Sequence, residues 1–285
     1  MNVSLVLATL GRVDEINRLM DTLIAQSERC FEVIVVDQNP DNRLVPIVAR
    51  AIAFGLEVIH LHQATPNLAS ARNRGIATAR YEIVAFPDDD CWYEPDTIAS
   101  VIASFQESPS LQGVVACWVE QTNASGHPAQ KGYLQLNSWQ RFRGGNASSI
   151  SLFLRRSLLG ELDGFDTRLG VGQWFGAAEE TDLILRALTT GAELARCPSA
   201  KVHHAFGAKP PIDWRVAFRN ARHRARGTGA LYAKHRLSAY VILRGFTAPI
   251  FLPLLTAAGV KAIASGLATT WGRIEGWSRW SWEAL

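Results

Sequence analysis

The stretch from Glu82 to Asp90, which reads Glu-Ile-Val-Ala-Phe-Pro-Asp-Asp-Asp, decides the fold, because a short apolar run ends in three consecutive carboxylates. Three similar apolar runs precede it, at residues 3–8, 32–36 and 57–61, and segments with helical periodicity lie between the runs, at residues 15–25, 44–54 and 68–79. Near-continuous apolar strands that alternate with helices predict βαβ units and a sheet buried on both faces. We therefore predict a doubly wound α/β fold with a mostly parallel sheet flanked by helices, and ligands beyond the carboxyl ends of its strands.

The composition is that of a folded chain with an uneven charge. The 285 residues are 48% hydrophobic and 19% charged, which excludes an intrinsically disordered protein. The net charge is +3, but the segment from Arg196 to Arg244 holds eleven basic residues and one acid, so it carries +10 and the remainder carries 3 − 10 = −7. This asymmetry predicts an acidic site and a basic surface for an anionic partner. The alternative is a solvated basic face without a partner.

The cysteines and the N-terminal sequence point to a reducing compartment. The four cysteines are scattered without a C-x-x-C pair, so neither a zinc ribbon nor a disulfide framework is expected. The first residues lack the basic region and the cleavage site of a signal peptide. We expect a protein with reduced thiols on the cytoplasmic side of the cell.

Three polar strand ends should meet at one edge of the sheet. They are Thr9 to Arg12, Asp37, and Asp88 to Asp90. The sequence has neither a G-x-G-x-x-G nor a P-loop motif after its first strand, so a glycine-rich loop is not expected to hold phosphates. Adjacent carboxylates are best tolerated beside a hard cation such as Mg²⁺ or Mn²⁺. The alternative is a surface turn whose aspartates cap the helix that follows Pro95.

Two motifs in sequence carry a family resemblance. Asn67 to Gly75 reads Asn-Leu-Ala-Ser-Ala-Arg-Asn-Arg-Gly, and the Asp88–Asp90 strand end with Pro95 follows it. Together they resemble the inverting nucleotide-sugar glycosyltransferases of family 2, in which a helix with A-R-N-x-G precedes an Asp-x-Asp strand end. The resemblance implies the Rossmann-like GT-A fold. It also implies that Asp90 binds the metal that bridges the donor diphosphate, and that Asp88 contacts the ribose or the metal.

The same resemblance implies further donor contacts. Asp37 would accept hydrogen bonds from the base, and Arg72 would lie near the diphosphate. A histidine after the catalytic helix can complete the metal site in relatives, which makes His203 and His204 candidate ligands. The implied nucleotide-sugar contacts are Thr9, Arg12, Asp37, Arg72, Asp88 and Asp89.

The second half of the match runs from Gly164 to Leu183 and resembles the acceptor side of the family. The family pattern there is Glu-Asp-x-Asp-Leu, and its second acid is the general base. Glu180 occupies that position, so it is the implied base, and Glu179 and Asp182 remain alternatives. A base is needed because the acceptor hydroxyl loses a proton as it attacks. The alternative interpretation is three acids stabilised by a helix dipole.

The chain beyond Phe206 lies outside the resemblance. A helix is expected over residues 212–234, and Arg215, Arg219, Arg222 and Arg226 would form one basic stripe on it. The uncharged segment 245–260 is too short to span a bilayer and should be interrupted at Pro249 and Pro253. Four tryptophans then lie among arginines, which suits the headgroup layer. We interpret this tail as amphipathic and membrane-associating, by an interfacial or re-entrant anchor. The alternatives are a membrane span and a homo-oligomer interface.

These observations predict a catalytic GT-A domain over residues 1–207 and a helical membrane-associating tail over residues 208–285. The donor half would cover about 1–117 and the acceptor half about 118–207. The resemblance implies metal-dependent, inverting sugar transfer from a nucleotide diphosphate. The tail indicates a lipid-linked or polysaccharide acceptor at the cytoplasmic side of the membrane. No nucleic acid is expected as a partner. The alternatives are a non-catalytic sugar-nucleotide-binding scaffold and a nucleotidyltransferase.

Overall fold

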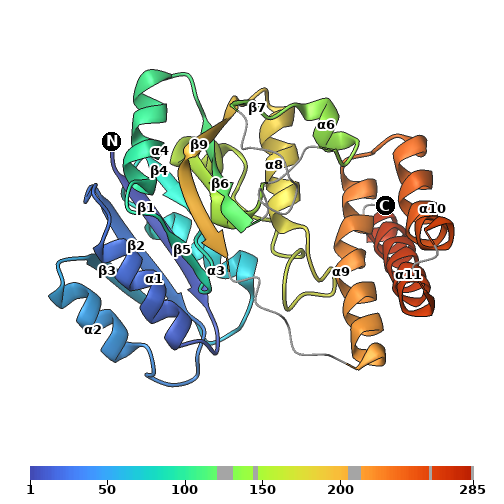
Figure 1. The fold of residues 1–285 in the computed structure, drawn as a ribbon, viewed down its shortest axis with the longest axis horizontal. Helices are drawn as coiled ribbons and strands as arrows, with labels where there is room; N and C mark the ends of the chain where they lie inside the picture. Colours follow the sequence, from blue (N-terminus) through green and yellow to red (C-terminus); the bar gives the residue numbers. More distant parts are fainter. Residues whose placement is uncertain (121–130, 144–146, 205–212, 257–258, 284–285) are drawn as a thin grey trace.

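The computed structural model describes residues 1–120, 131–143, 147–204, 213–256 and 259–283 (Figure 1). One nine-stranded sheet has the order β3-β2-β1-β4-β8-β6-β9-β5, and β7 pairs with β9. The strands are β1 (Val3–Thr9), β2 (Phe31–Asp37), β3 (Glu57–His62), β4 (Ile83–Ala85), β5 (Cys91–Tyr93), β6 (Gly113–Trp118), β7 (Gly132–Tyr133), β8 (Leu152–Arg155) and β9 (Leu194–His204).

Helices cover the sheet and continue beyond it. Those of the first 204 residues are α1 (Asp14–Ile24), α2 (Val45–Ala53), α3 (Leu68–Thr78), α4 (Thr97–Glu107), α6 (Leu136–Gln140), the short η1 (Ser149–Ser151), α7 (Arg156–Glu161) and α8 (Glu179–Thr189). The C-terminal helices are α9 (Trp214–Lys234), α10 (Ala239–Leu255) and α11 (Val260–Glu283). The predicted tail helix therefore begins at Trp214. Residue 212 and the proposed boundary between residues 207 and 208 lie outside the described residues.

The N-terminal half of the sheet is parallel throughout. Strands β3, β2, β1 and β4 pair in parallel, with α1, α2 and α3 as crossovers, and their ends lie within two residues of the predicted ones. Beyond β4 the sheet is mixed, because β8 is antiparallel to both β4 and β6, and β5 is antiparallel to β9. The α/β class is confirmed, but "mostly parallel" describes only this half.

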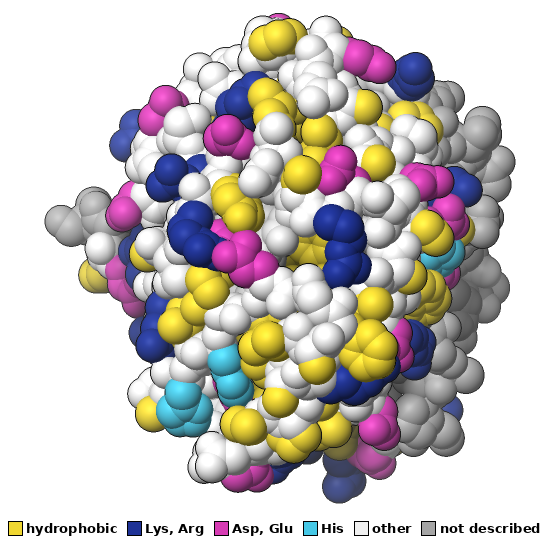
Figure 2. Space-filling view, turned by 90° about the vertical axis from the view of Figure 1, so that its left-hand side faces the viewer, with side chains coloured by type: hydrophobic (Ala, Val, Ile, Leu, Met, Phe, Trp, Pro, Cys, Tyr) yellow, Lys and Arg dark blue, Asp and Glu magenta, His cyan; other side chains and the backbone are white. Residues whose placement is uncertain are grey.

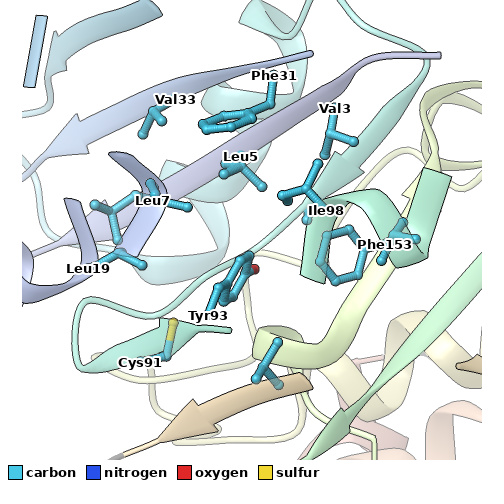
Figure 3. Packing of buried hydrophobic residues seen from close by; sticks show 14 of the residues in the cluster. Val3, Leu5, Leu7, Leu19, Phe31, Val33, Cys91, Tyr93, Ile98 and Phe153 are labelled. Atoms are coloured by element: carbon cyan, nitrogen blue, oxygen red, sulfur yellow. The ribbon is translucent and has the colours of Figure 1, made fainter. Parts of the chain in front are cut away.

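Two apolar cores lie on opposite faces of the sheet. In β1 the alternate residues Val3, Leu5 and Leu7 belong to one core, and Val6 and Ala8 belong to the other. Successive side chains of a strand point to opposite faces, so helices on both sides are needed to bury all seven residues of β1. Figure 3 shows the first core, where side chains of β1, β2, β5, α4 and β8 meet.

The surface near α1, α2 and β3 does not carry a patch of one charge in the part that the structure describes. Figure 2 shows that basic and acidic side chains are interspersed on this face, with hydrophobic side chains between them. The basic excess of residues 196–244 is therefore not a property of this face.

The C-terminal helices lie together on the side of the sheet away from α2 (Figure 1). Helices α9 and α11 approach at their backbones: a Cβ atom on Gly272 would lie 2.1 Å from the carbonyl oxygen of Arg222, and one on Gly276 would lie 1.9 Å from that of Arg226. Only glycine allows this approach, since a Cβ at that distance overlaps the neighbouring backbone.

Helix α10 is continuous through its two prolines, so the predicted interruptions are wrong. A proline leaves the carbonyl four residues earlier without its helical donor. For Pro249 that carbonyl belongs to Gly245, and the Arg273 Nη1 group of α11 donates to it at 2.6 Å. For Pro253 it is the carbonyl of Pro249, against which Gly266 of α11 packs without a side chain. Helix α11 therefore supports α10 at both positions.

The predicted arginine stripe is divided between two environments. Arg222 and Arg226 each donate from Nε to Glu275 of α11 at 2.9 Å, whereas Arg215 and Arg219 are exposed. None of the described helices is both long enough and apolar enough to cross a bilayer.

We predict that Gly276→Ala destabilises the protein by about 1–3 kcal/mol, because the added methyl group overlaps the Arg226 carbonyl and forces α9 and α11 apart. Urea unfolding measures this change. Gly160→Ala in α7 is the control, since a Cβ there meets nothing within 4 Å and alanine favours the helix. Equal stability of both variants would contradict the close packing.

Candidate active site

A cavity of about 660 Å³ lies at the carboxyl ends of β1 and β4. The predicted strand ends meet there, as do a loop before α8 and the helix α9. The lining includes Thr9, Arg12, Gln38, Asn67, Asp88, Asp89, Asp90, Val171, Gly172, Gly176, His204, Asn220, His223 and Arg224. Of the implied donor contacts, Thr9, Arg12, Asp88 and Asp89 line this cavity.

Asp88, Asp90 and His204 form a group that fits a metal ion. One ligand atom from each lies within 4.8 Å of the others, and His204 Nε2 is 2.9 Å from Asp90 Oδ1. The pairing of β5 with β9 produces this proximity, because Cys91 lies opposite His204. Two carboxylates with one imidazole suit a divalent ion such as Mn²⁺, and Mg²⁺ accepts the two carboxylates.

His203 lies apart from this group. Its Nδ1 is 2.7 Å from Glu120 Oε1 and its Nε2 is 3.2 Å from Glu94 Oε1, while its ring stacks on Trp92. Adjacent residues of a strand point in opposite directions, so His203 and His204 cannot both face the aspartates. The structure therefore brings one of the two candidate histidines to the site.

Asp89 and Asp90 share the guanidinium of Arg12. Thr9 Oγ1 donates to Asp89 at 2.8 Å, and Arg12 Nη1 lies 2.7 Å from Asp89 and 2.5 Å from Asp90. Burial raises the pKa of Asp89 to about 6, against the hydrogen bond from Thr9 and the charge of Arg12. Burial also acts to raise the pKa of Asp90, but His204 and Arg12 outweigh it and hold that pKa at about 2. Of the three aspartates, Asp90 is thus the one whose pKa is lowered.

Arg72 joins the two acidic motifs. Its guanidinium is buried and donates to Asp88 at 2.9 Å, to the Ser149 hydroxyl at 2.9 Å and to Glu179 at 3.2 Å. Burial acts to lower the pKa of Arg72, but the charges of Asp88 and Glu179 raise it above its ordinary value. Arg72 is therefore a permanent cation between residues that are 91 positions apart in sequence.

The neighbours of Arg72 in the motif have packing roles. Asn73 Nδ2 donates to the Phe165 carbonyl at 2.8 Å, and its Oδ1 accepts from the Phe165 N–H at 2.7 Å. A Cβ on Gly75 would lie 2.2 Å from a methyl group of Val6, so only glycine lets α3 lie this close to β1. The motif thus docks α3 on the sheet and ties the loop before α8 to it.

The three acids of the α8 start have different partners. Glu179 is buried and bonds to Arg72, and Asp182 is buried among Arg186, Lys234 and His235, at 2.8, 2.8 and 2.9 Å. Glu180 is half-buried. Burial and the adjacent charge of Glu179 raise the pKa of Glu180 above its ordinary value. The preceding residue, Ala178, has a left-handed φ of 84°, which is strained for a residue with a Cβ.

Asp37 faces inward. Its Oδ1 accepts from the backbone and side-chain nitrogens of Asn39 at 2.8 and 2.7 Å, and its Oδ2 lies 3.0 Å from His60 Nε2. Asn39 in turn accepts from the Gly11 N–H at 2.7 Å. Asp37 therefore ties the ends of β1, β2 and β3 together, and its neighbour Gln38 lines the cavity.

Some residues near the site were not expected from the sequence. Ser149 bonds to Arg72, and Asn220, His223 and Arg224 come from α9. The sequence signal for the last three was their helical spacing of i, i+3 and i+4.

The cavity at the strand ends, the aspartate-rich turn and the helices on both faces define a GT-A type of sugar-nucleotide fold. Residues 4–161 match the family described as glycosyl transferase family 2, which is more than half of the chain. The chain belongs to glycosyl transferase family 2.

Curated relatives support this assignment. The chain is 22% identical over 231 residues to a glucosyl-dolichyl phosphate glucuronosyltransferase of Haloferax volcanii, covering 76% of this chain and 73% of that protein. It is 28% identical over 109 residues to an uncharacterised glycosyltransferase of Haemophilus influenzae. That alignment covers 38% of this chain and spans only 36% of the length of the relative.

Solved structures share the fold. The mannosyltransferase PcManGT from Pyrobaculum calidifontis, in complex with GDP-Man and Mn²⁺, has a TM-score of 0.66 at 18% identity and covers 100% of this chain and 88% of its own. S. aureus TarS residues 1–349, in complex with UDP-GlcNAc, has a TM-score of 0.62 at 14% identity and covers 95% and 90%.

We predict that Asp182→Asn destabilises the folded protein by about 3 kcal/mol at neutral pH, because it removes a fully buried carboxylate that accepts from Arg186, Lys234 and His235. Burial acts to raise the pKa of Asp182, but His235, Arg186 and Lys234 lower it below the ordinary 3.8. The stabilisation is therefore complete above about pH 4 and is lost as the pH falls through the folded-state pKa.

Urea unfolding of wild type and variant at about pH 7 and about pH 3 measures the effect, and the difference between them should shrink in acid. Asp21→Asn is the control, since its ion pair with Arg50 is exposed. A difference that grows on acidification would show that the pKa of Asp182 is not lowered.

Proposed function

We propose that the protein is an inverting glycosyltransferase, which moves a sugar from a nucleotide diphosphate to an acceptor hydroxyl. One observation carries the proposal: the buried guanidinium of Arg72 holds Asp88, from the Asp-x-Asp turn, and Glu179, next to Glu180, within one hydrogen-bonded unit. Such a transfer needs a site for the leaving diphosphate and a base for the acceptor close to each other.

Asp88, Asp90 and His204 would hold a divalent metal. When bound, the metal neutralises the charge that develops on the departing diphosphate. The geometry of the three ligand atoms supports this role, and PcManGT contains Mn²⁺. Thr9 and Arg12 keep Asp89 and Asp90 in place, so their part is to position the turn.

Glu180 is proposed as the general base. Glu179 is bound by Arg72, and Asp182 is bound by Arg186, Lys234 and His235, which leaves Glu180 as the acid of this turn that can take up a proton. A raised pKa also strengthens a carboxylate as a base.

The reaction balances with these groups. The acceptor oxygen forms a bond to the anomeric carbon from the face opposite the nucleotide, and its proton goes to Glu180. The bond from the anomeric carbon to the diphosphate oxygen breaks, and the nucleoside diphosphate leaves with the electron pair. UDP- and GDP-linked sugars are the first candidate donors, because the two solved neighbours hold UDP-GlcNAc and GDP-Man.

A lipid-linked or polysaccharide acceptor at the cytoplasmic side of the membrane is proposed from the tail. The end of α10 and the start of α11 expose large apolar side chains, with Leu255 81% and Val260 82% exposed, beside the exposed Lys261. Apolar side chains next to a cation suit the boundary of an anionic bilayer. The Haloferax volcanii relative is named for a sugar on dolichyl phosphate, which is a lipid carrier.

We predict that Glu180→Gln lowers kcat by about 10²–10⁴-fold while nucleotide affinity is retained, because only proton transfer is lost. Product formation from UDP- and GDP-sugars with Mn²⁺ measures this loss, and calorimetry measures nucleotide binding. In the wild type, kcat should rise with pH as Glu180 ionises, with a midpoint above the ordinary 4.5 of a glutamate.

Asp90→Ala and removal of metal by EDTA should both abolish transfer. Glu161→Gln in α7 is the matched control, since Glu161 is exposed and lies on a different helix from the three acids of α8. Full activity of both Glu180→Gln and Asp90→Ala would overturn the assignment. Nucleotide binding without any transfer would favour the non-catalytic scaffold.

We predict that Leu255→Asp weakens binding to phosphatidylglycerol vesicles by about tenfold or more, because it places a charge where an apolar side chain would enter the bilayer. Cosedimentation measures the bound fraction. Ile52→Asp is the control, since Ile52 is 51% exposed on α2, on the opposite side of the molecule (Figure 1). Equal binding of both variants would contradict membrane docking by the tail.

A further inference from the structure

Helix α9 reaches the cavity that holds the aspartate turn. Asn220, His223 and Arg224 line it together with Asp88 and Asp90. These residues belong to the tail, beyond the span of the family match, which ends at residue 161. The cavity is therefore lined both by residues within the family match and by residues of the tail, which lie outside that match.

The face of α9 that reaches the cavity is fixed by close packing. Asn220, His223, Arg224 and Gly227 follow at i, i+3, i+4 and i+7, so they share one helical face. A Cβ on Gly227 would lie 2.1 Å from the carbonyl oxygen of Ala177, and one on Gly176 would lie 2.1 Å from the imidazole of His223. The side chains that these glycines lack would push α9 away from the cavity.

The arginines at the aspartate turn are already paired. Arg12 bonds to Asp89 and Asp90, and Arg72 bonds to Asp88 and Glu179. Arg224 is exposed, and within the described ranges no carboxylate lies at ion-pair distance from it. Arg224 is thus a cation that lines an acidic cavity and remains available to an anionic ligand.

A diphosphate is the anion that fits this position. A diphosphate brings negative charge into a cavity that already holds three aspartates. A positively charged side chain is therefore needed there, in addition to a metal ion bound by Asp88, Asp90 and His204. The planar guanidinium of arginine presents several N–H donors and binds phosphate oxygens in pairs.

We propose that Arg224 binds the diphosphate of the donor nucleotide, so that the tail helix α9 completes the donor site. This inference rests on the proposed function, because it takes the nucleotide diphosphate as the ligand. It assigns to α9 a second role besides packing against α11. His223, packed on Gly176, is a positioning residue that sets the distance of Arg224 from the cavity.

The test compares full-length variants by calorimetry with UDP and GDP in the presence of Mn²⁺, and with uridine and guanosine. Arg224→Ala should weaken binding of the diphosphate that the wild type binds by about 10–100-fold, the range expected for a charged hydrogen bond. Binding of the corresponding nucleoside should change less than about twofold, since it has no phosphate. Arg224→Lys should keep part of the diphosphate affinity as a point charge.

Arg236→Ala is the matched control, because Arg236 is also exposed, follows the end of the same helix and does not line the cavity. Equal diphosphate affinity of Arg224→Ala and Arg236→Ala would overturn the inference. So would an equal loss for diphosphate and nucleoside, which indicates a change of structure. If the wild type transfers sugar and Arg224→Ala does so with the same KM, only this inference fails. If the wild type binds neither diphosphate, the proposed function fails as well.

Discussion

The site depends on the burial of one guanidinium, that of Arg72. A buried charge without partners is strongly unfavourable, so Arg72 is stable there only while Asp88 and Glu179 accept its hydrogen bonds. The dependence is mutual, because without Arg72 these carboxylates would repel each other. Neither acidic motif can move without breaking a bond to the same cation. The distance between the aspartate turn and the start of α8 is therefore set by one side chain of α3.

Most of the N-terminal half could be predicted from the sequence, because each of its strands is marked by a pattern within a few consecutive residues. A strand such as β1, buried on both faces, must be apolar throughout, and that pattern is readable without knowledge of the partners. The acidic turn could be predicted for the same reason, since it follows a buried strand. The choice between His203 and His204 could not, because it depends on the register in which β9 meets β5. The link from Asp88 to Glu179 through Arg72 also joins segments that are distant in the chain.

The tail shows what helical periodicity can predict and what it cannot. The spacing of Arg215, Arg219, Arg222 and Arg226 correctly placed them on one stripe, but spacing does not reveal what covers a stripe. Glu275 of α11 pairs with Arg222 and Arg226, the C-terminal half of the stripe. The guanidinium groups of Arg226 and Arg279 lie 4.4 and 4.3 Å from the ring centre of Trp174. Arginine and tryptophan side chains that are close together can thus stabilise packing within the protein as well as binding to a bilayer surface.

The start of α8 is held in place by contacts from two distant parts of the chain. Ala178 takes a left-handed conformation that costs a residue with a Cβ about 1–2 kcal/mol, and the surrounding contacts must hold it there. Those contacts come from both sides: Arg72 of α3 holds Glu179, and Lys234 and His235, at the end of α9, hold Asp182. Glu180 lies between two anchored acids, so its position is fixed while its own carboxylate is not bound to a cationic side chain in the described part of the chain. A general base needs that combination, because a carboxylate already bound to a cation is a weaker acceptor for a proton.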